Sequence, residues 1–177
     1  MSDTNAAVGS YNAHSDAEAA VKELQRAGFD MTKLSIIGKD YHTEEHVIGY
    51  YNTGDRMKFW GKLGAFWGGF WGLLFGSAML LVPGIGHVIV FGPVVGWIIA
   101  ALEDAAVVGG LTALGAGLVS IGIPKNSVLN YEQALKASKF LVIAHGTTAE
   151  VAKAKAILQN SGATTVDTHE MHLPTKK

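Results

Sequence analysis

The polar and apolar positions of this chain follow amphipathic patterns near both ends, whereas the middle is continuously apolar. Between Lys62 and Glu103 no residue carries a formal charge, and His87 is the only ionisable side chain there. We therefore expect one α/β domain whose two halves are separated by an apolar insertion. The expected boundaries are 1–57 for the first half, 58–123 for the insertion and 124–177 for the second half.

The first half predicts a strand, a helix and a second strand. Residues 8–14 and 34–38 have the composition of strands. Between them, AEAAVKELQRAG places its apolar residues on one side of a helix. Ser15 and Glu18 have the spacing of a capping box at the start of this helix, and Gly28 is placed to end it.

The last third repeats this plan. FLVIAH (140–145) predicts a buried strand, and residues 164–168 predict a final strand. Thr147 and Glu150 form a second capping-box pattern, which opens a helix that Gly162 ends. Two such units in one domain predict an α+β fold of the ferredoxin-like type, a split βαβ sandwich with two helices on a four-stranded antiparallel sheet.

The apolar middle predicts a glycine-rich helical hairpin that interrupts this domain. The run 63–82 matches the roughly 20 residues that cross a bilayer as a helix, and the basic residues before it are typical of a cytoplasmic end. We expect helices over 62–82 and 86–102 with a turn at Pro83–Gly86. If both halves complete one sheet, the number of crossings is even, so 105–123 is expected as a third helix packed on the hairpin or along the interface. A polar helix over 125–138 should follow.

Four glycines recur at every fourth position of the first predicted limb and would form its helix-packing face: Gly64, Gly68, Gly72 and Gly76. Each glycine costs a helix about 1 kcal/mol relative to alanine, so close packing against another helix must compensate. Lipid and a protein core shared between copies of the chain both suit such a surface.

Histidines supply the candidate ligand sites. His14 and His145 each follow an alanine near the end of a strand, and we expect the two strands to be parallel central neighbours. Both rings would then lie near helix N-termini, which favour a small anionic ligand. His42 and His46 would share a helix face and are weak metal candidates, while His169 is expected in a solvated tail. No metal site or cofactor is expected.

Composition narrows the function classes. The net charge is −1 with no basic block, which argues against nucleic acid as a partner. The chain has no cysteine, so disulfides and thiolate metal sites are excluded. The first residues lack the pattern of a secretory signal. No phosphate-binding loop and no Ser-His-Asp arrangement can be argued, so we do not expect an enzyme.

Three segments resemble a bacterial family of general-stress or heat-induced stress proteins that are regarded as membrane proteins. They are GYYNTGDRMKFWGKLGAFWGGFWGLLFG, VPGIGHVIVFGPVVGW and LGAGLVSIGIPKNSVLNYEQALK. The resemblance covers nearly the whole chain. It implies an α/β domain split by a glycine-zipper hairpin and an association with stress, and it supplies no catalytic residues.

The resulting expectation is a non-enzymatic stress protein that self-assembles through its hairpin in or on the cytoplasmic membrane, with the α/β domain facing the cytoplasm. Its partners would be further copies of itself and the lipid bilayer. Two alternatives remain: a soluble homo-oligomer whose hairpins form a shared core, and a small-ligand-binding regulatory domain.

Overall fold

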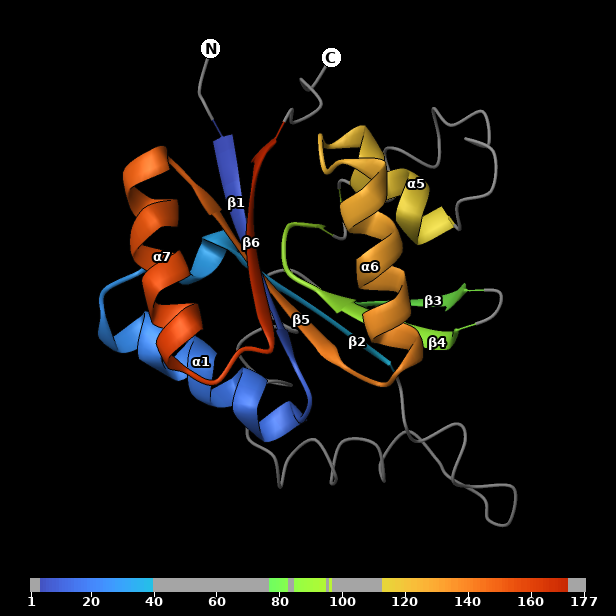
Figure 1. Cartoon of the computed structure of the whole chain (residues 1–177), viewed down its shortest axis with the longest axis horizontal. Helices are drawn as coiled ribbons and strands as arrows, with labels where there is room; N and C mark the ends of the chain where they lie inside the picture. The colour runs from blue at the N-terminus through green and yellow to red at the C-terminus, as the bar shows by residue number, and fades with distance from the viewer. Residues whose placement is uncertain (1–3, 40–76, 83–84, 95, 97–112, 172–177) are drawn as a thin grey trace.

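The computed structural model of the chain describes residues 4–39, 77–82, 85–94, 96 and 113–171. These residues form a six-stranded sheet with helices on both faces (Figure 1). The strands are β1 (Thr4–Tyr11), β2 (Leu34–Lys39), β3 (Ser77–Val82), β4 (Gly86–Phe91), β5 (Phe140–Gly146) and β6 (Thr165–Met171). The helices are α1 (His14–Arg26), the short 3₁₀ helix η1 (Met31–Lys33), α5 (Ala113–Ser120), α6 (Lys125–Lys136) and α7 (Thr148–Asn160).

The strand order is β3-β4-β2-β5-β1-β6, and every neighbouring pair is antiparallel. The predicted mixed α/β class, with an antiparallel sheet assembled from both ends of the chain, is confirmed. The sheet is wider than expected because β4 and β3 extend it beyond β2. Both of these strands come from the apolar middle of the sequence.

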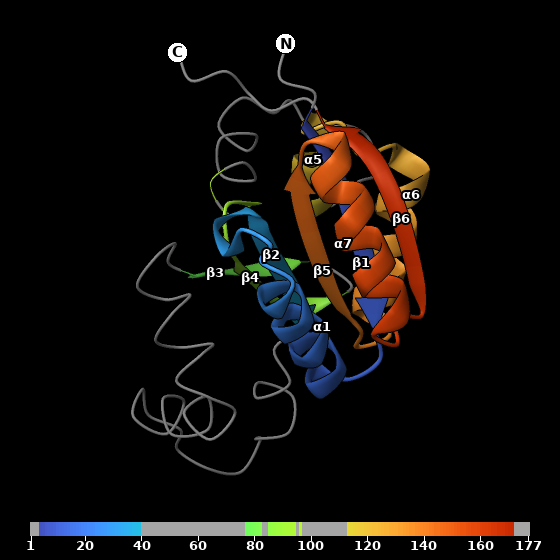
Figure 2. The ribbon, with the colours of Figure 1, turned by 90° about the vertical axis from the view of Figure 1, so that its left-hand side faces the viewer.

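The helices cover the two faces of the sheet in pairs. Figure 2 shows α1 and α7 side by side on one face, and Figure 1 shows α5 and α6 on the other. Successive residues of β5 point to opposite faces of the sheet. Val142 and Ala144 pack in the core under α1 and α7. Leu141 and Ile143 pack in the core under α5 and α6. Every residue from 140 to 144 is therefore buried, which explains why this strand reads as a continuous apolar run.

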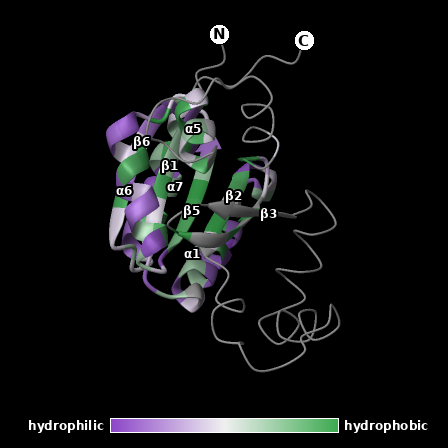
Figure 3. Ribbon diagram, turned by 90° about the vertical axis from the view of Figure 1, so that its right-hand side faces the viewer, coloured by the Kyte–Doolittle hydropathy of each residue, from purple (hydrophilic) through white to green (hydrophobic). Residues whose placement is uncertain are grey.

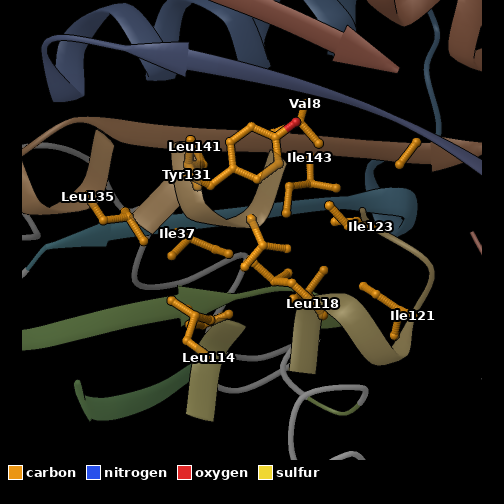
Figure 4. Packing of buried hydrophobic residues seen from close by; sticks show 14 of the residues in the cluster. Val8, Ile37, Leu114, Leu118, Ile121, Ile123, Tyr131, Leu135, Leu141 and Ile143 are labelled. Atoms are coloured by element: carbon orange, nitrogen blue, oxygen red, sulfur yellow. The ribbon is translucent and has the colours of Figure 1, made fainter. Parts of the chain in front are cut away.

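The core under α5 and α6 joins the middle of the sequence to both ends (Figure 4). Leu114 and Leu118 of α5 contact the same cluster as Ile37 of β2 and Ile143 of β5. All four side chains are at most 1% exposed. Figure 3 shows the matching pattern of hydropathy, with apolar (green) stretches in β2 and β5 and polar (purple) stretches on α6.

The prediction of a helical hairpin is wrong over residues 77–82 and 86–91. Residues 77–82 and 86–91, expected as parts of two helices, are the antiparallel strands β3 and β4. A short apolar run does not distinguish a buried strand from a buried helix, and β4 lies between β3 and β2 in the interior of the sheet. Without residues 77–82 the first predicted span retains only 63–76, which is shorter than the roughly 20 residues that a crossing needs.

The two predicted helices that follow are found among the residues that the structure describes. The third helix is described over Ala113–Ser120, and the polar helix over Lys125–Lys136. The predicted boundary at 57 lies outside the described residues, and the boundary at 123 falls between α5 and α6. Among the described residues, no helix has both the length and the apolar character of a membrane crossing.

The two halves of the α/β domain repeat the same strand–helix–strand plan, but their residues align differently from the prediction. Helices α1 and α7 bury equivalent residues, Ala20 with Ala154 and Leu24 with Leu158. They are followed by equivalent glycines with left-handed backbone, Gly28 (φ +77°) and Gly162 (φ +87°). In this alignment His145 corresponds to Tyr11, so the predicted match of His145 with His14 is wrong.

One of the two predicted capping boxes forms. The Thr147 hydroxyl accepts a hydrogen bond from the Glu150 amide, and the Glu150 carboxylate accepts one from the Thr147 amide. Helix α1 instead begins at His14, with Ala13 as its N-cap and no side-chain hydrogen bond there. Ser15 therefore falls inside the first turn rather than at the cap.

Candidate functional site

The two histidines proposed to frame an anion site are not brought together. Because β5 lies between β1 and β2 and is antiparallel to both, His145 is opposite Ala6, whereas Tyr11 at the far end of β1 is opposite Phe140. Ala6 and Tyr11 are about 17 Å apart along the strand, and His14 lies beyond Tyr11. The expectation of parallel strands with both rings at one edge is wrong, and a site shared by the two residues has no geometric basis.

The surroundings of His145 form a charged cluster of polar side chains. We define the β5–α7 cluster as Asp30, Lys33, His145, Thr147 and Glu150. The Lys33 ammonium contacts the Glu150 carboxylate at 2.7 Å and so ties η1 to the first turn of α7. Asp30 accepts hydrogen bonds from both the amide and the hydroxyl of Thr32, which fixes η1.

The pKa values of three residues in this cluster are lowered, and hydrogen bonds from Thr32 lower the pKa of Asp30. Hydrogen bonds from Lys33 and from the Thr147 amide lower the pKa of Glu150 to about 2. Burial, reinforced by the nearby Lys33 ammonium, lowers the pKa of His145 to about 4, although a hydrogen bond with the Lys33 backbone acts in the opposite direction. At neutral pH the His145 ring is therefore uncharged and Glu150 is ionised.

The N-terminus of α7 is consequently occupied by a carboxylate of its own helix. An anion arriving from solution would have to displace Glu150 from the Thr147 amide and from Lys33. The predicted preference of this helix end for anions is satisfied within the chain. The β5–α7 cluster joins structural elements, and its geometry does not indicate an exchangeable ligand.

The second cluster joins α6 to β6 on the opposite face of the sheet. We define the α6–β6 cluster as Tyr131, Asp167 and His169. The Tyr131 hydroxyl lies 2.5 Å from His169 Nε2 and donates a 3.3 Å hydrogen bond to Asp167 Oδ2. The two rings meet edge to face with their centroids 5.9 Å apart. Burial raises the pKa of Tyr131, reinforced by Asp167, and burial lowers the pKa of His169.

Sequence reasoning does not find the α6–β6 cluster, because it places His169 in a solvated tail. Strand β6 instead continues to Met171, so His169 is half-buried within the sheet. The sequence does indicate that Tyr131 is buried, because its spacing from Val128 and Leu135 places all three on one side of α6. That spacing places Tyr131 inward, but it does not identify a partner on a strand more than thirty residues away.

The other predicted site residues lie outside the described residues. These are the packing glycines Gly64, Gly68, Gly72 and Gly76, together with the metal candidates His42 and His46. Within the described residues, no three His, Cys, Asp or Glu side chains are grouped so that they could hold a metal ion.

Comparison with known proteins supplies one match. Residues 6–81 match the family model of the heat-induced stress protein YflT domain. No curated protein and no solved structure matches the chain. The matched range begins in β1, includes α1 and β2, and reaches β3. This match confirms the resemblance to heat-induced stress proteins over residues 6–81, which are less than half of the chain.

Proposed function

We propose that this protein is a non-catalytic, stress-associated protein that works by assembling with copies of itself. The family match supports the association with stress. The observation that carries the self-assembly is the position of β3, an uncharged apolar strand at one edge of the sheet. An edge strand presents unpaired backbone N–H and C=O groups that favour pairing with another chain.

We also propose that the strands β6-β1-β5-β2, with α1 and α7 on one face, form a ferredoxin-like unit. The interleaved order and the antiparallel pairing of these strands support this description. In this account β4 and β3 extend the unit on its β2 side, and α5 and α6 cover the face opposite α1 and α7. The apolar middle of the chain is thereby built partly into the domain.

Light scattering after size exclusion tests the assembly. The full chain has a mass of 18.7 kDa, and we expect a stable multiple of this mass in buffer without detergent. A mass of one chain at every concentration up to about 100 μM, well above typical micromolar affinities, would contradict the proposal. Co-flotation of the same sample with lipid vesicles distinguishes assembly in solution from the membrane association that the sequence predicted.

A further inference from the structure

The two edges of the sheet differ in charge. Strand β6, at one edge, has the sequence TVDTHEM, which includes Asp167 and Glu170. Strand β3, at the other edge, has the sequence SAMLLV, with no charged residue and no proline. Charges and prolines on edge strands are the usual devices that prevent pairing between chains. Such devices are present on β6 and absent from β3.

Strand β3 also has the regular geometry that pairing requires. It pairs with β4 along its whole length, from Ser77 opposite Phe91 to Val82 opposite Gly86, without a bulge. Backbone groups alternate between the two sides of a strand, so pairing with β4 on one side leaves the second set directed away from the sheet. No further strand joins β3 among the described residues.

We propose that β3 pairs antiparallel with β3 of a second copy of this chain, so that two six-stranded sheets become one continuous sheet. This inference rests on the proposed self-assembly and names its surface. A two-fold axis at Met79, near the middle of β3, places Met79 opposite its own copy, makes the interface self-complementary and closes it at a dimer. The contact then lies on the strands, not on the glycine ladder predicted from the sequence.

Charge selects this mode over the other edge-to-edge arrangements. Pairing of β6 with β6 would gather four carboxylates, Asp167 and Glu170 of each copy, along one interface, and like charges on facing strands are unfavourable. Pairing of β3 with β6 would place those carboxylates beside an uncharged strand and would propagate head to tail into an open assembly. Only β3 with β3 brings two uncharged edges together.

A charge-swap experiment at Met79 tests the interface. Met79 is opposite Ile89 in the sheet register and not opposite the buried Val88 or Val90, so a charge there is less disruptive to the core. We expect both Met79→Lys and Met79→Glu to raise the dimer dissociation constant at least about tenfold, a change of 1.4 kcal/mol. An equimolar mixture of the two variants should recover the dimer, because unlike charges then face each other.

The matched control places the same charge on the other edge. Thr168→Lys changes an exposed residue of β6 and should leave the mass unchanged. Wild-type mass in both Met79 variants, or no dimer in their mixture, would overturn the β3 interface while leaving self-assembly in place. A monomeric wild type would instead contradict the proposed function itself. If the Met79 variants fail to fold by circular dichroism, the double variants Ser77→Lys/Leu81→Lys and Ser77→Glu/Leu81→Glu give the equivalent readout, because the axis at Met79 places Leu81 opposite Ser77 of the second copy.

Discussion

Replacing Gly92 by alanine should lower the free energy of unfolding by about 3 kcal/mol or more, combining backbone strain with a steric clash. Gly92 follows β4 and has a φ of +94°, a conformation that residues with a side chain rarely adopt. A Cβ atom at this position would overlap the Leu34 carbonyl oxygen and lie 2.8 Å from Ser35 Cα. Both contacts are backbone atoms at the start of β2, so β2 or the segment after β4 would have to move.

Loss of this close approach should also break a buried hydrogen bond. The Val94 amide donates to the Ser35 hydroxyl at 3.2 Å, and both residues are fully buried. An unsatisfied buried polar group costs about 1–3 kcal/mol. The same substitution therefore loosens the attachment of the middle of the chain to the sheet.

Alanine substitutions at two other glycines distinguish backbone strain from steric clash as the cause of the lost stability. Gly28 has a φ of +77° but open space where the Cβ atom of an alanine would lie, so Gly28→Ala should cost only about 1 kcal/mol from strain. Gly96 has no positive φ, and among the described residues no atom lies within 4 Å of the place where a Cβ atom would be, so Gly96→Ala should be close to neutral. Urea denaturation of the three variants measures the series, and equal stabilities for Gly92→Ala and Gly96→Ala would contradict the packing of this segment on β2.

Acidification from pH 6.5 to pH 4.5 should destabilise the protein by about 2 kcal/mol through His145 alone. The pKa of His145 falls from its ordinary value of 6.5 to about 4 in the folded chain, mainly because burial disfavours the charged ring. Below pH 6.5 the unfolded chain takes up a proton that the folded chain does not. The stability contributed by the neutral ring is therefore complete above pH 6.5 and declines as the pH falls towards 4.

Glu150, in the same cluster, affects the free energy of unfolding at lower pH than His145 does. Because the pKa of Glu150 is held at about 2, its contribution is lost as the pH falls below its ordinary value of 4.5. The interval from pH 6.5 to 4.5 thus isolates the histidines. His145→Gln should flatten the decline in this interval, whereas His169→Gln should remove only the smaller part due to His169, whose pKa is also lowered by burial. A wild-type stability that is constant across the interval would contradict the buried, neutral state of His145.

The two ends of the chain were predictable because their signals are local. The amphipathic helices, the glycines that follow them and the Thr147–Glu150 capping box depend on residues within a few positions of one another. The relative direction of β1 and β5 was predicted incorrectly because it depends on topology. The crossover through α1 makes β1 and β2 parallel, and β5 enters between them and runs opposite to both.

The middle of the chain was predicted incorrectly because hydropathy does not specify what covers an apolar segment. The runs SAMLLV and GHVIVF suit a lipid-facing helix by composition, yet they form β3 and β4. The β-branched residues of β4, which include Val88 and Val90, were the available signal for a strand. The polar clusters were harder to foresee, since Lys33 with Glu150 and Tyr131 with His169 are pairs that only the tertiary fold brings together.

The central claim is that the uncharged middle of the chain is part of the same sheet as its ends, and disulfide trapping across β2 and β4 tests it most directly. The chain has no native cysteine, so a pair introduced at Ile36 and Phe91, or at Lys39 and Val88, reports only on this register. Facing Cα atoms in antiparallel strands are about 4.5–5.5 Å apart, within the range that a disulfide spans, and the two pairs sample both kinds of facing position. Mild oxidation should close at least one of these pairs within a single folded chain, whereas the offset control with cysteines at Ile36 and Val88 should stay reduced. Failure of both matched pairs to close, or equal closure of the control, would contradict the account.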